Sequence, residues 1–155
     1  MRLHLFKITV MKKVIIALLL FTGLQSFSQT WGTNIEEAKK QAAEQNKNIL
    51  LVFSGSDWCG PCMKLDKNIW QSEAFKIESK KHWILVKADF PKKKNHQLSA
   101  ELTESNNQLA EKYNQDGNFP LVVLLDKNGK VLGITAYKDV DAEQYLESLF
   151  ELEKR

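Results

Sequence analysis

Three short and continuous apolar runs constrain the fold of this chain more than any other feature. They are residues 49–53 (ILLVF), 83–86 (WILV) and 121–125 (LVVLL). A run of this length without polar alternation is typical of a strand buried on both faces, as in a parallel sheet. Between the runs lie longer stretches whose apolar residues recur every three or four positions, which is the period of a helix packed on such a sheet.

The predicted helices begin near Thr33, near Cys59, at Ser72, near His96, and near Asp139 or Asp141. The first is opened by a capping box in residues 33–36 and ends near Gln45. The second ends near Trp70, and the fourth ends near Tyr113. A chain of this size can bury a sizeable core without covalent cross-links.

Residues 126–129 (DKNG) are a hairpin signal, because an Asn-Gly pair tolerates the positive φ angles that a tight turn requires. The hairpin would join the third strand to an antiparallel fourth strand in residues 131–137. The resulting order α-β-α-β-α-β-β-α predicts an α/β fold. We expect a parallel sheet covered on both faces, with one antiparallel edge.

Residues 1–28 differ from the remainder of the chain. They contain four basic residues and no acidic residue, then an apolar run at 14–21, then small and polar residues. This order predicts a secretory signal peptide cleaved near Ser28–Gln29, with a single domain in residues 29–155. The apolar run is shorter than the roughly 20 residues that span a bilayer. An uncleaved anchor is the alternative, and Met11 is an alternative start to Met1.

The net charge of +3 that the whole chain carries comes from residues 1–28. Of the 22 basic residues, 18 remain after residue 28, against 19 acidic residues, which gives a net charge of about −1. The charge of the domain therefore does not indicate a nucleic-acid or anionic-membrane partner. Export would place the domain in an oxidising compartment, where neighbouring thiols tend to pair.

The two cysteines, Cys59 and Cys62, lie two residues apart in the segment GSDWCGPCMKLD. A structural zinc site needs four Cys or His ligands, and His82 and His96 have no ligand-like spacing, so we expect no metal. Two inert core thiols are an alternative. A structural disulfide is another, although so small a loop would stabilise the fold little.

The position of the pair favours redox chemistry. Pro61 suits the first turn of a helix, which would place Cys59 at the helix N-terminus. Free N–H groups and the helix dipole favour a thiolate there, so a lowered thiol pKa would make Cys59 a nucleophile. Cys62, one turn further, would resolve a mixed disulfide on Cys59. Trp58 would offer an apolar platform beside the sulfur.

The motif WCGPC on a strand–turn–helix, followed by a βα-ββα half, resembles the thioredoxin family over residues 49–150. The resemblance implies a thioredoxin fold with a four-stranded mixed sheet and an additional N-terminal helix. It implies catalysis by Cys59 and Cys62, supported by Trp58, Gly60 and Pro61. It also implies that Phe119-Pro120 forms a cis-proline loop that faces the cysteines and presents its backbone to substrate.

Some features differ from thioredoxin itself. The family has a buried acid in the strand before the motif, whereas residues 51–53 are apolar here and the nearby Asp57 is expected to be solvated. Met63 stands where the family usually has Lys. The segment between the second and third strands is longer. These features are more similar to exported thioredoxin-like proteins, such as the C-terminal domain of the membrane reductase that passes electrons to the periplasm.

We therefore expect an exported, periplasmic thiol–disulfide oxidoreductase that uses the Cys59/Cys62 disulfide and no other cofactor. Protein disulfides would be its substrates, and a membrane thiol relay would be its electron donor. The Gly60-Pro61 dipeptide resembles that of reducing members. A disulfide oxidase or isomerase and a binding module with silent cysteines are the alternatives. Residues 92–94 (KKK) would form a solvated loop or dock an acidic partner, and Trp31, Trp70 and Trp83 would be packing residues.

Overall fold

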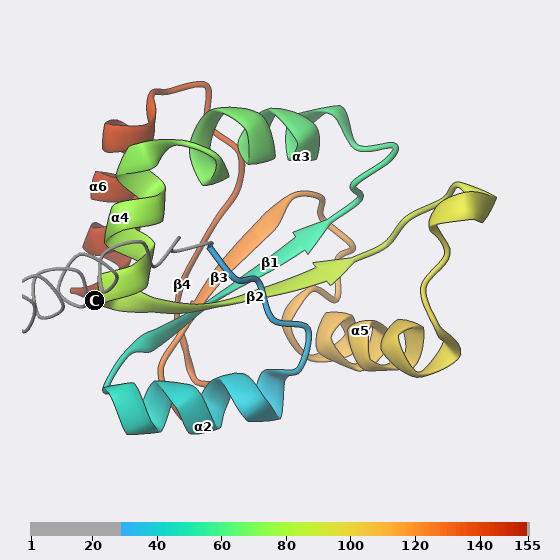
Figure 1. Cartoon of the computed structure of the whole chain (residues 1–155), viewed down its shortest axis with the longest axis horizontal. Coiled ribbons are helices and arrows are strands. Elements are labelled where there is room, and N and C mark those ends of the chain that lie inside the picture. The colour runs from blue at the N-terminus through green and yellow to red at the C-terminus, as the bar shows by residue number, and fades with distance from the viewer. Residues whose placement is uncertain (1–28, 155) are drawn as a thin grey trace, which may run out of the picture.

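The computed structural model describes residues 29–154, and the predicted signal peptide lies outside them. It confirms the predicted thioredoxin fold, with a four-stranded mixed sheet and helices on both faces (Figure 1). The strands are β1 (Asn48–Ser54), β2 (Trp83–Asp89), β3 (Leu121–Leu125) and β4 (Val131–Thr135). The helices are α2 (Ile35–Gln45), α3 (Gly60–Leu65), α4 (Glu73–His82), α5 (Ala100–Tyr113) and α6 (Ala142–Glu153), with a π-helical turn at Asp66–Trp70 and a 3-10 turn at Lys94–His96.

The strand β1 divides the core into two layers, because successive side chains of a strand point to opposite faces of its sheet. Leu50 and Val52 pack with α3, α4 and α6, in the cluster that also holds Trp70. Ile49, Leu51 and Phe53 pack on the other face, against α2 and α5 (Figure 1). The continuous apolar run is therefore explained by burial on both faces, as predicted.

The sheet has the order β2-β1-β3-β4, in which only β1 and β2 are parallel. The expectation of a parallel sheet with one antiparallel edge was wrong for β3, which runs antiparallel to β1. A parallel β3 would need α5 to carry the chain back to the end where β1 begins. Residues 90–99 first extend beyond the sheet, and β3 then enters where β1 leaves, so that Leu121 pairs with Phe53 (Figure 1).

Several element ends differ from the prediction. Asn34, not Thr33, caps α2, because its side chain accepts from the backbone N–H groups of Glu36 and Glu37. The helix predicted from His96 begins only at Ala100, since the 3-10 turn precedes it as a separate element. The strand predicted over residues 131–137 ends at Thr135.

The other predicted boundaries agree with the structure. The helical path after the cysteines ends at Trp70, and Ser72 caps α4 by accepting from the backbone N–H of Phe75 at 3.1 Å. Asp141 caps α6 in the same way. In the β3–β4 hairpin, Gly129 has a φ of +86° but Asn128 does not have a positive φ, so only half of the predicted Asn-Gly pair adopts the left-handed conformation.

Within residues 29–154, no helix is long and apolar enough to span a bilayer.

Candidate active site

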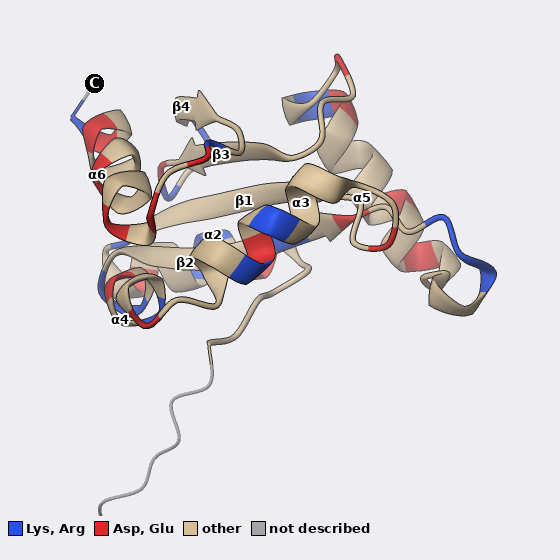
Figure 2. Ribbon diagram, turned by 90° about the horizontal axis from the view of Figure 1, so that it is seen from above, with Lys and Arg blue, Asp and Glu red and all other residues tan. Residues whose placement is uncertain are grey.

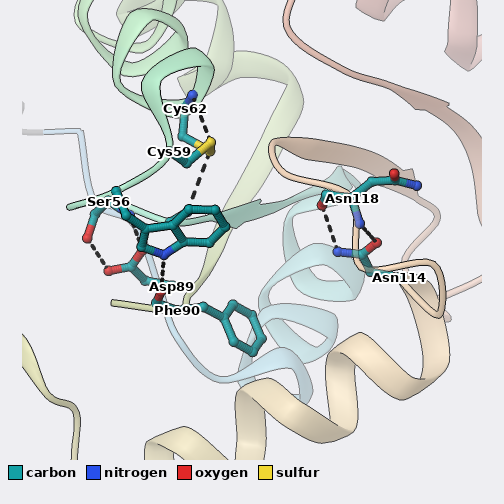
Figure 3. The surroundings of a disulfide bond; sticks show 9 residues. Ser56, Cys59, Cys62, Asp89, Phe90, Asn114 and Asn118 are labelled. Carbon is teal, nitrogen blue, oxygen red and sulfur yellow. Dashed lines mark hydrogen bonds between the residues drawn. A yellow bond between two sulfur atoms is a disulfide. The ribbon is translucent and has the colours of Figure 1, made fainter. Parts of the chain in front are cut away.

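The two cysteines lie where β1 gives way to α3. Cys59 is the N-cap residue of α3, with extended backbone, and Pro61 lies in the first turn of the helix, as predicted. Cys59 and Cys62 form a disulfide with an S–S distance of 2.06 Å (Figure 3). Because α3 starts at Cys59, as predicted, the two cysteines lie one helical turn apart and their sulfur atoms can bond.

Backbone N–H groups surround the sulfur atoms. The N–H of Cys62 donates to Sγ of Cys59 at 3.2 Å, and the N–H of Gly55 donates to Sγ of Cys62 at 3.5 Å. Both cysteines are buried, with 4% of Cys59 and 3% of Cys62 exposed. When the disulfide is reduced, the same donor would stabilise a thiolate on Cys59, because a charged acceptor strengthens a hydrogen bond.

Trp58 is held beside the disulfide by two neighbours. Its indole Nε1–H donates to the backbone carbonyl oxygen of Phe90 at 2.7 Å (Figure 3). Its ring meets Phe119 edge-to-face, with 5.4 Å between the ring centroids. Because 38% of Trp58 is exposed, the ring presents an apolar surface next to Cys59.

The peptide bond Phe119-Pro120 is cis, which confirms what the family resemblance implied. A cavity of about 520 Å³ lies along this loop and is lined by Pro61, Phe119, Pro120, Ile134 and Tyr137, among others. The cavity thus joins the helix that carries the cysteines to the cis-proline loop. The structure brings the predicted residues Pro61, Phe119 and Pro120 to one surface.

Asn114 braces this loop, and sequence reasoning did not identify it. Its Nδ2 donates to the backbone carbonyl oxygen of Asn118, and its Oδ1 accepts from the backbone N–H of Asn118, both at 2.9 Å (Figure 3). Asn114 is 5% exposed, so these two bonds satisfy a buried amide. Asn114 therefore fixes the chain directly before Phe119.

Asp57 is not solvated, which corrects the expectation from the sequence. Its carboxylate accepts from the backbone N–H groups of Lys92 and Lys93, both at 2.9 Å, and lies 3.1 Å from Nδ1 of His96. Only 3% of its side chain is exposed. The bond from the Lys92 N–H is the main cause that lowers the pKa of Asp57 below its ordinary value of 3.8.

A second carboxylate ties the turn before the cysteines to the end of β2. Asp89 accepts from both the backbone N–H and the hydroxyl of Ser56 (Figure 3). These partners are 33 residues apart in the sequence, and those of Asp57 are 35 to 39 residues apart. No local pattern reveals such pairs, which is why the sequence analysis missed them.

Residues 92–94 are exposed, but the backbone of this loop is anchored at the site. It forms a basic stretch after β2 (Figure 2). Its backbone is anchored on Asp57, and the Lys92 ammonium nitrogen lies 3.9 Å from the centroid of the Trp58 ring. The prediction of a solvated loop is therefore confirmed for its side chains, and Lys92 in addition contacts the ring of Trp58.

The remaining predictions concern residues at a distance from the disulfide. Within the described residues, no group of three or more His, Cys, Asp or Glu side chains is placed to hold a metal ion. Trp70 and Trp83 are buried core residues, and Trp31 packs against the same cluster, which confirms their predicted packing role. The residues 51–53 are at most 1% exposed and bring no acid to the cysteines.

Two curated proteins of Chlamydia pneumoniae are similar to this chain. "Disulfide bond reductase DsbH" is 36% identical over 110 residues, which are 71% of this chain and 64% of that protein. "Thioredoxin-related protein DsbJ" is 29% identical over 100 residues, which are 64% of this chain and 28% of that protein. The chain thus spans less than two thirds of the length of either relative.

Solved structures give the same picture of the fold. One titled "DsbH Oxidoreductase" superposes with a TM-score of 0.74 at 28% identity, and the match covers 85% of this chain and 95% of the other. The oxidised C-terminal domain of DsbD from Neisseria meningitidis superposes with a TM-score of 0.53 at 16% identity, and the match covers 80% of this chain and 98% of that domain. The second likeness concerns the fold alone.

A family model described as thioredoxin-like matches residues 30–127, which include α2, the disulfide and the cis-proline loop. This match covers more than half of the chain, and it agrees with the sequence and structural relatives. The chain therefore belongs to the thioredoxin-like family.

Proposed function

We propose that this protein is an exported thiol–disulfide oxidoreductase that reduces disulfide bonds in other exported proteins. The observation that carries the proposal is the Cys59–Cys62 disulfide at the start of α3, beside the cis-proline loop. So small a disulfide loop contributes little to stability, which leaves its chemistry as the reason for its presence. The similarity to a protein named a disulfide bond reductase supports the direction of the reaction.

The reaction begins with both cysteines reduced. The Cys59 thiolate attacks one sulfur of the substrate disulfide, and the other substrate sulfur leaves as a thiolate and takes up a proton. Cys62, deprotonated, then attacks Sγ of Cys59, which forms the Cys59–Cys62 disulfide and releases the second substrate thiolate. The substrate gains two electrons and the cysteine pair loses two. A dithiol donor returns them by the reverse exchange.

The neighbouring residues support these steps. Trp58 and the Phe119-Pro120 loop form the surface on which the substrate polypeptide would lie, since both are next to the disulfide. Gly60 borders open space, because a Cβ atom at this position would have nothing within 4 Å. Pro61 fixes the backbone of the first helical turn. We propose that the disulfide is the whole redox centre, without metal or organic cofactor.

Export and the electron donor belong to the same proposal. The basic and apolar order of residues 1–28 supports an export signal, with the domain of residues 29–155 acting in the periplasm. A reductase in an oxidising compartment needs a source of electrons, and we propose a membrane thiol relay as the donor. Fractionation of cells and N-terminal sequencing of the exported protein test cleavage near Ser28–Gln29.

The redox equilibrium with glutathione tests the direction of electron flow. A reductase is expected to have a potential near roughly −270 mV, whereas a strong oxidase lies near about −120 mV. The purified domain should also reduce insulin when dithiothreitol is supplied. A potential close to that of the oxidase would replace the proposed reductase with an oxidase or isomerase. A rate of insulin reduction no higher than that of dithiothreitol alone, at every dithiothreitol concentration, would favour the binding module with silent cysteines.

A further inference from the structure

A second cavity, of about 560 Å³, shares the wall residue Phe119 with the cis-proline cavity. Its volume falls within the range of about 300–1,000 Å³ that is typical of ligand pockets. Its wall is formed by Trp58, Asp89, Phe90, Pro91, Lys92, Gln97, Leu98, Thr103, Asn106 and Phe119. The cavity therefore lies between Trp58, residues 89–98, helix α5 and the cis-proline loop.

The cavity borders residues that lie next to the disulfide. Phe119 lines both cavities, and Trp58, the residue before Cys59, lines this one. A polypeptide whose sulfur is bonded to Cys59 would therefore lie across Trp58 and Phe119. Side chains on one side of the substrate cysteine would then reach this second cavity.

The outer wall is fixed in place by hydrogen bonds rather than left open. The backbone of Lys92 and Lys93 is bonded to Asp57, and the carbonyl of Phe90 accepts from Trp58. Both anchors, Asp57 and Trp58, directly precede Cys59. The cavity is thus built onto the same turn that carries the disulfide.

Two polar groups of the wall indicate the chemistry of an occupant. The Lys92 ammonium group lies over the Trp58 ring and makes no ion pair within residues 29–154, so it can receive a carboxylate. Asn106 is 1% exposed, its Nδ2 donates to the carbonyl oxygen of Asp89, and its Oδ1 has no partner among the described residues. A buried acceptor without a donor is costly, so a hydroxyl or N–H group would be favoured beside it.

We propose that this cavity, the Trp58–Asn106 cavity, binds an aromatic side chain of the substrate polypeptide that carries a hydrogen-bond donor, such as tyrosine, next to an acidic residue. The apolar wall would bury the ring, Asn106 would accept from its polar end, and Lys92 would pair with the acid. This inference rests on the proposed function, and it names the kind of substrate polypeptide that the Cys59/Cys62 pair would reduce.

The test measures kcat/KM on synthetic peptides with dithiothreitol as the electron donor. Each peptide carries one cysteine in a mixed disulfide with a fluorescence-quenching thiol, and a Tyr-Glu pair is scanned along both sides of the cysteine. Matched peptides have Ser-Gln instead. We expect at least about a tenfold higher kcat/KM for the best Tyr-Glu peptide, because burial of an aromatic ring is worth this much.

Two pairs of variants locate the effect. Thr103→Trp, on the cavity side of α5, should fill the cavity and remove the preference for Tyr-Glu. Gln108→Trp, on the same helix but outside the cavity wall, should preserve it. Lys92→Gln should reduce the preference for Glu over Gln, whereas Lys93→Gln, whose side chain does not line the cavity, should have a smaller effect.

A small substrate separates this inference from the proposed function. Bis(2-hydroxyethyl) disulfide fills no side-chain cavity, so the wild type and the two control variants, Gln108→Trp and Lys93→Gln, should reduce it at similar rates. Equal kcat/KM for Tyr-Glu and Ser-Gln peptides at every position, with normal turnover of the small disulfide, would overturn the inference alone. A preference that survives Thr103→Trp would also overturn it. Failure of the wild type to reduce any disulfide would overturn the proposed function instead.

Discussion

The indole Nε1–H of Trp58 donates a hydrogen bond of 2.7 Å to the backbone carbonyl oxygen of Phe90. This bond fixes the ring beside the disulfide to the segment that follows β2. The ring lies directly against Gly55, since a Cβ atom at Gly55 would overlap Cε2 of the indole. The absence of a side chain at Gly55 is therefore a condition for the position of Trp58.

Substitution of Gly55 by Ala should displace the Trp58 ring and break its bond to Phe90. We expect the free energy of unfolding to fall by about 1–3 kcal/mol, as for other overpacked sites. Gly60→Ala is the matched control, because its Cβ would meet nothing within 4 Å and Ala is the better helix former. Urea unfolding, followed by tryptophan fluorescence, measures both variants. Equal stability of the two would contradict the close contact.

The two cysteines should behave differently when each is replaced. Cys59→Ser should abolish disulfide reduction, because the attacking sulfur at the start of α3 is lost. Cys62→Ser should still attack but should accumulate a mixed disulfide with the substrate, since no second sulfur resolves it. Mass spectrometry after incubation with an oxidised protein substrate distinguishes the two. Normal turnover in Cys59→Ser would rule out the proposed nucleophile.

The thiol of Cys59 should be more acidic than a free cysteine in the reduced protein. The backbone N–H of Cys62, whose nitrogen lies 3.2 Å from Sγ of Cys59, favours the thiolate of Cys59, and so does the helix start. Thiolate absorbance or the pH dependence of alkylation would measure this acidity, with Cys62→Ser used to assign the signal. We expect a pKa clearly below the value of about 8.5 for free cysteine. An alkylation profile like that of a free thiol would count against nucleophilic activation.

Replacement of Asp57 by Asn should loosen the loop of residues 90–99 in a pH-dependent manner. The N–H of Lys92 foremost, with that of Lys93 and the His96 side chain, lowers the pKa of Asp57 in the folded protein. The stabilisation is thus fully present above the unfolded value near 3.8, and it is lost as the pH falls through the lower folded pKa. Urea unfolding across this range should show the wild type and Asp57→Asn converging at acidic pH. A constant difference would show that the carboxylate charge is not responsible.

Loss of the Asn114 side chain should unfasten the cis-proline loop. Asn114→Ala removes two hydrogen bonds to the Asn118 backbone, each worth about 1 kcal/mol, so we expect a loss of roughly 2 kcal/mol. Protein-disulfide reduction should fall with it, because the loop presents Phe119-Pro120 to the substrate. Asn128→Ala, in the exposed β3–β4 turn, is the control and should be near neutral. Unchanged stability in Asn114→Ala would show that the loop is held by other contacts.

The parts of the fold that were predicted correctly follow from local signals. The burial of β1 on both faces and the capping of α4 by Ser72 were predicted because each depends on residues that are neighbours in the sequence. The direction of β3 was not predictable in this way. It depends on how far the extension after β2 carries the chain before α5 begins, and no periodicity records that distance.

The site shows the same division. Cys59, Cys62 and Pro61 were found because their spacing and the helix start are local. The solvation of Asp57 was predicted wrongly because its partners, the backbone N–H groups of Lys92 and Lys93, come close only when β1 and β2 pair. The Trp58–Asn106 cavity was not foreseen for the same reason, since four separate segments of the chain form its wall.

The two edge strands of the sheet, β2 and β4, differ in how much of their outer edge is open to pairing with another chain. Gly32 exchanges two backbone hydrogen bonds with β2, donating to Leu85 at 2.8 Å and accepting from Lys87 at 2.9 Å. The segment around Gly32 thereby covers part of the outer edge of β2, whereas no described segment pairs with the outer edge of β4. An incoming strand, whether from a partner or from a second copy during aggregation, would therefore add more readily beside β4.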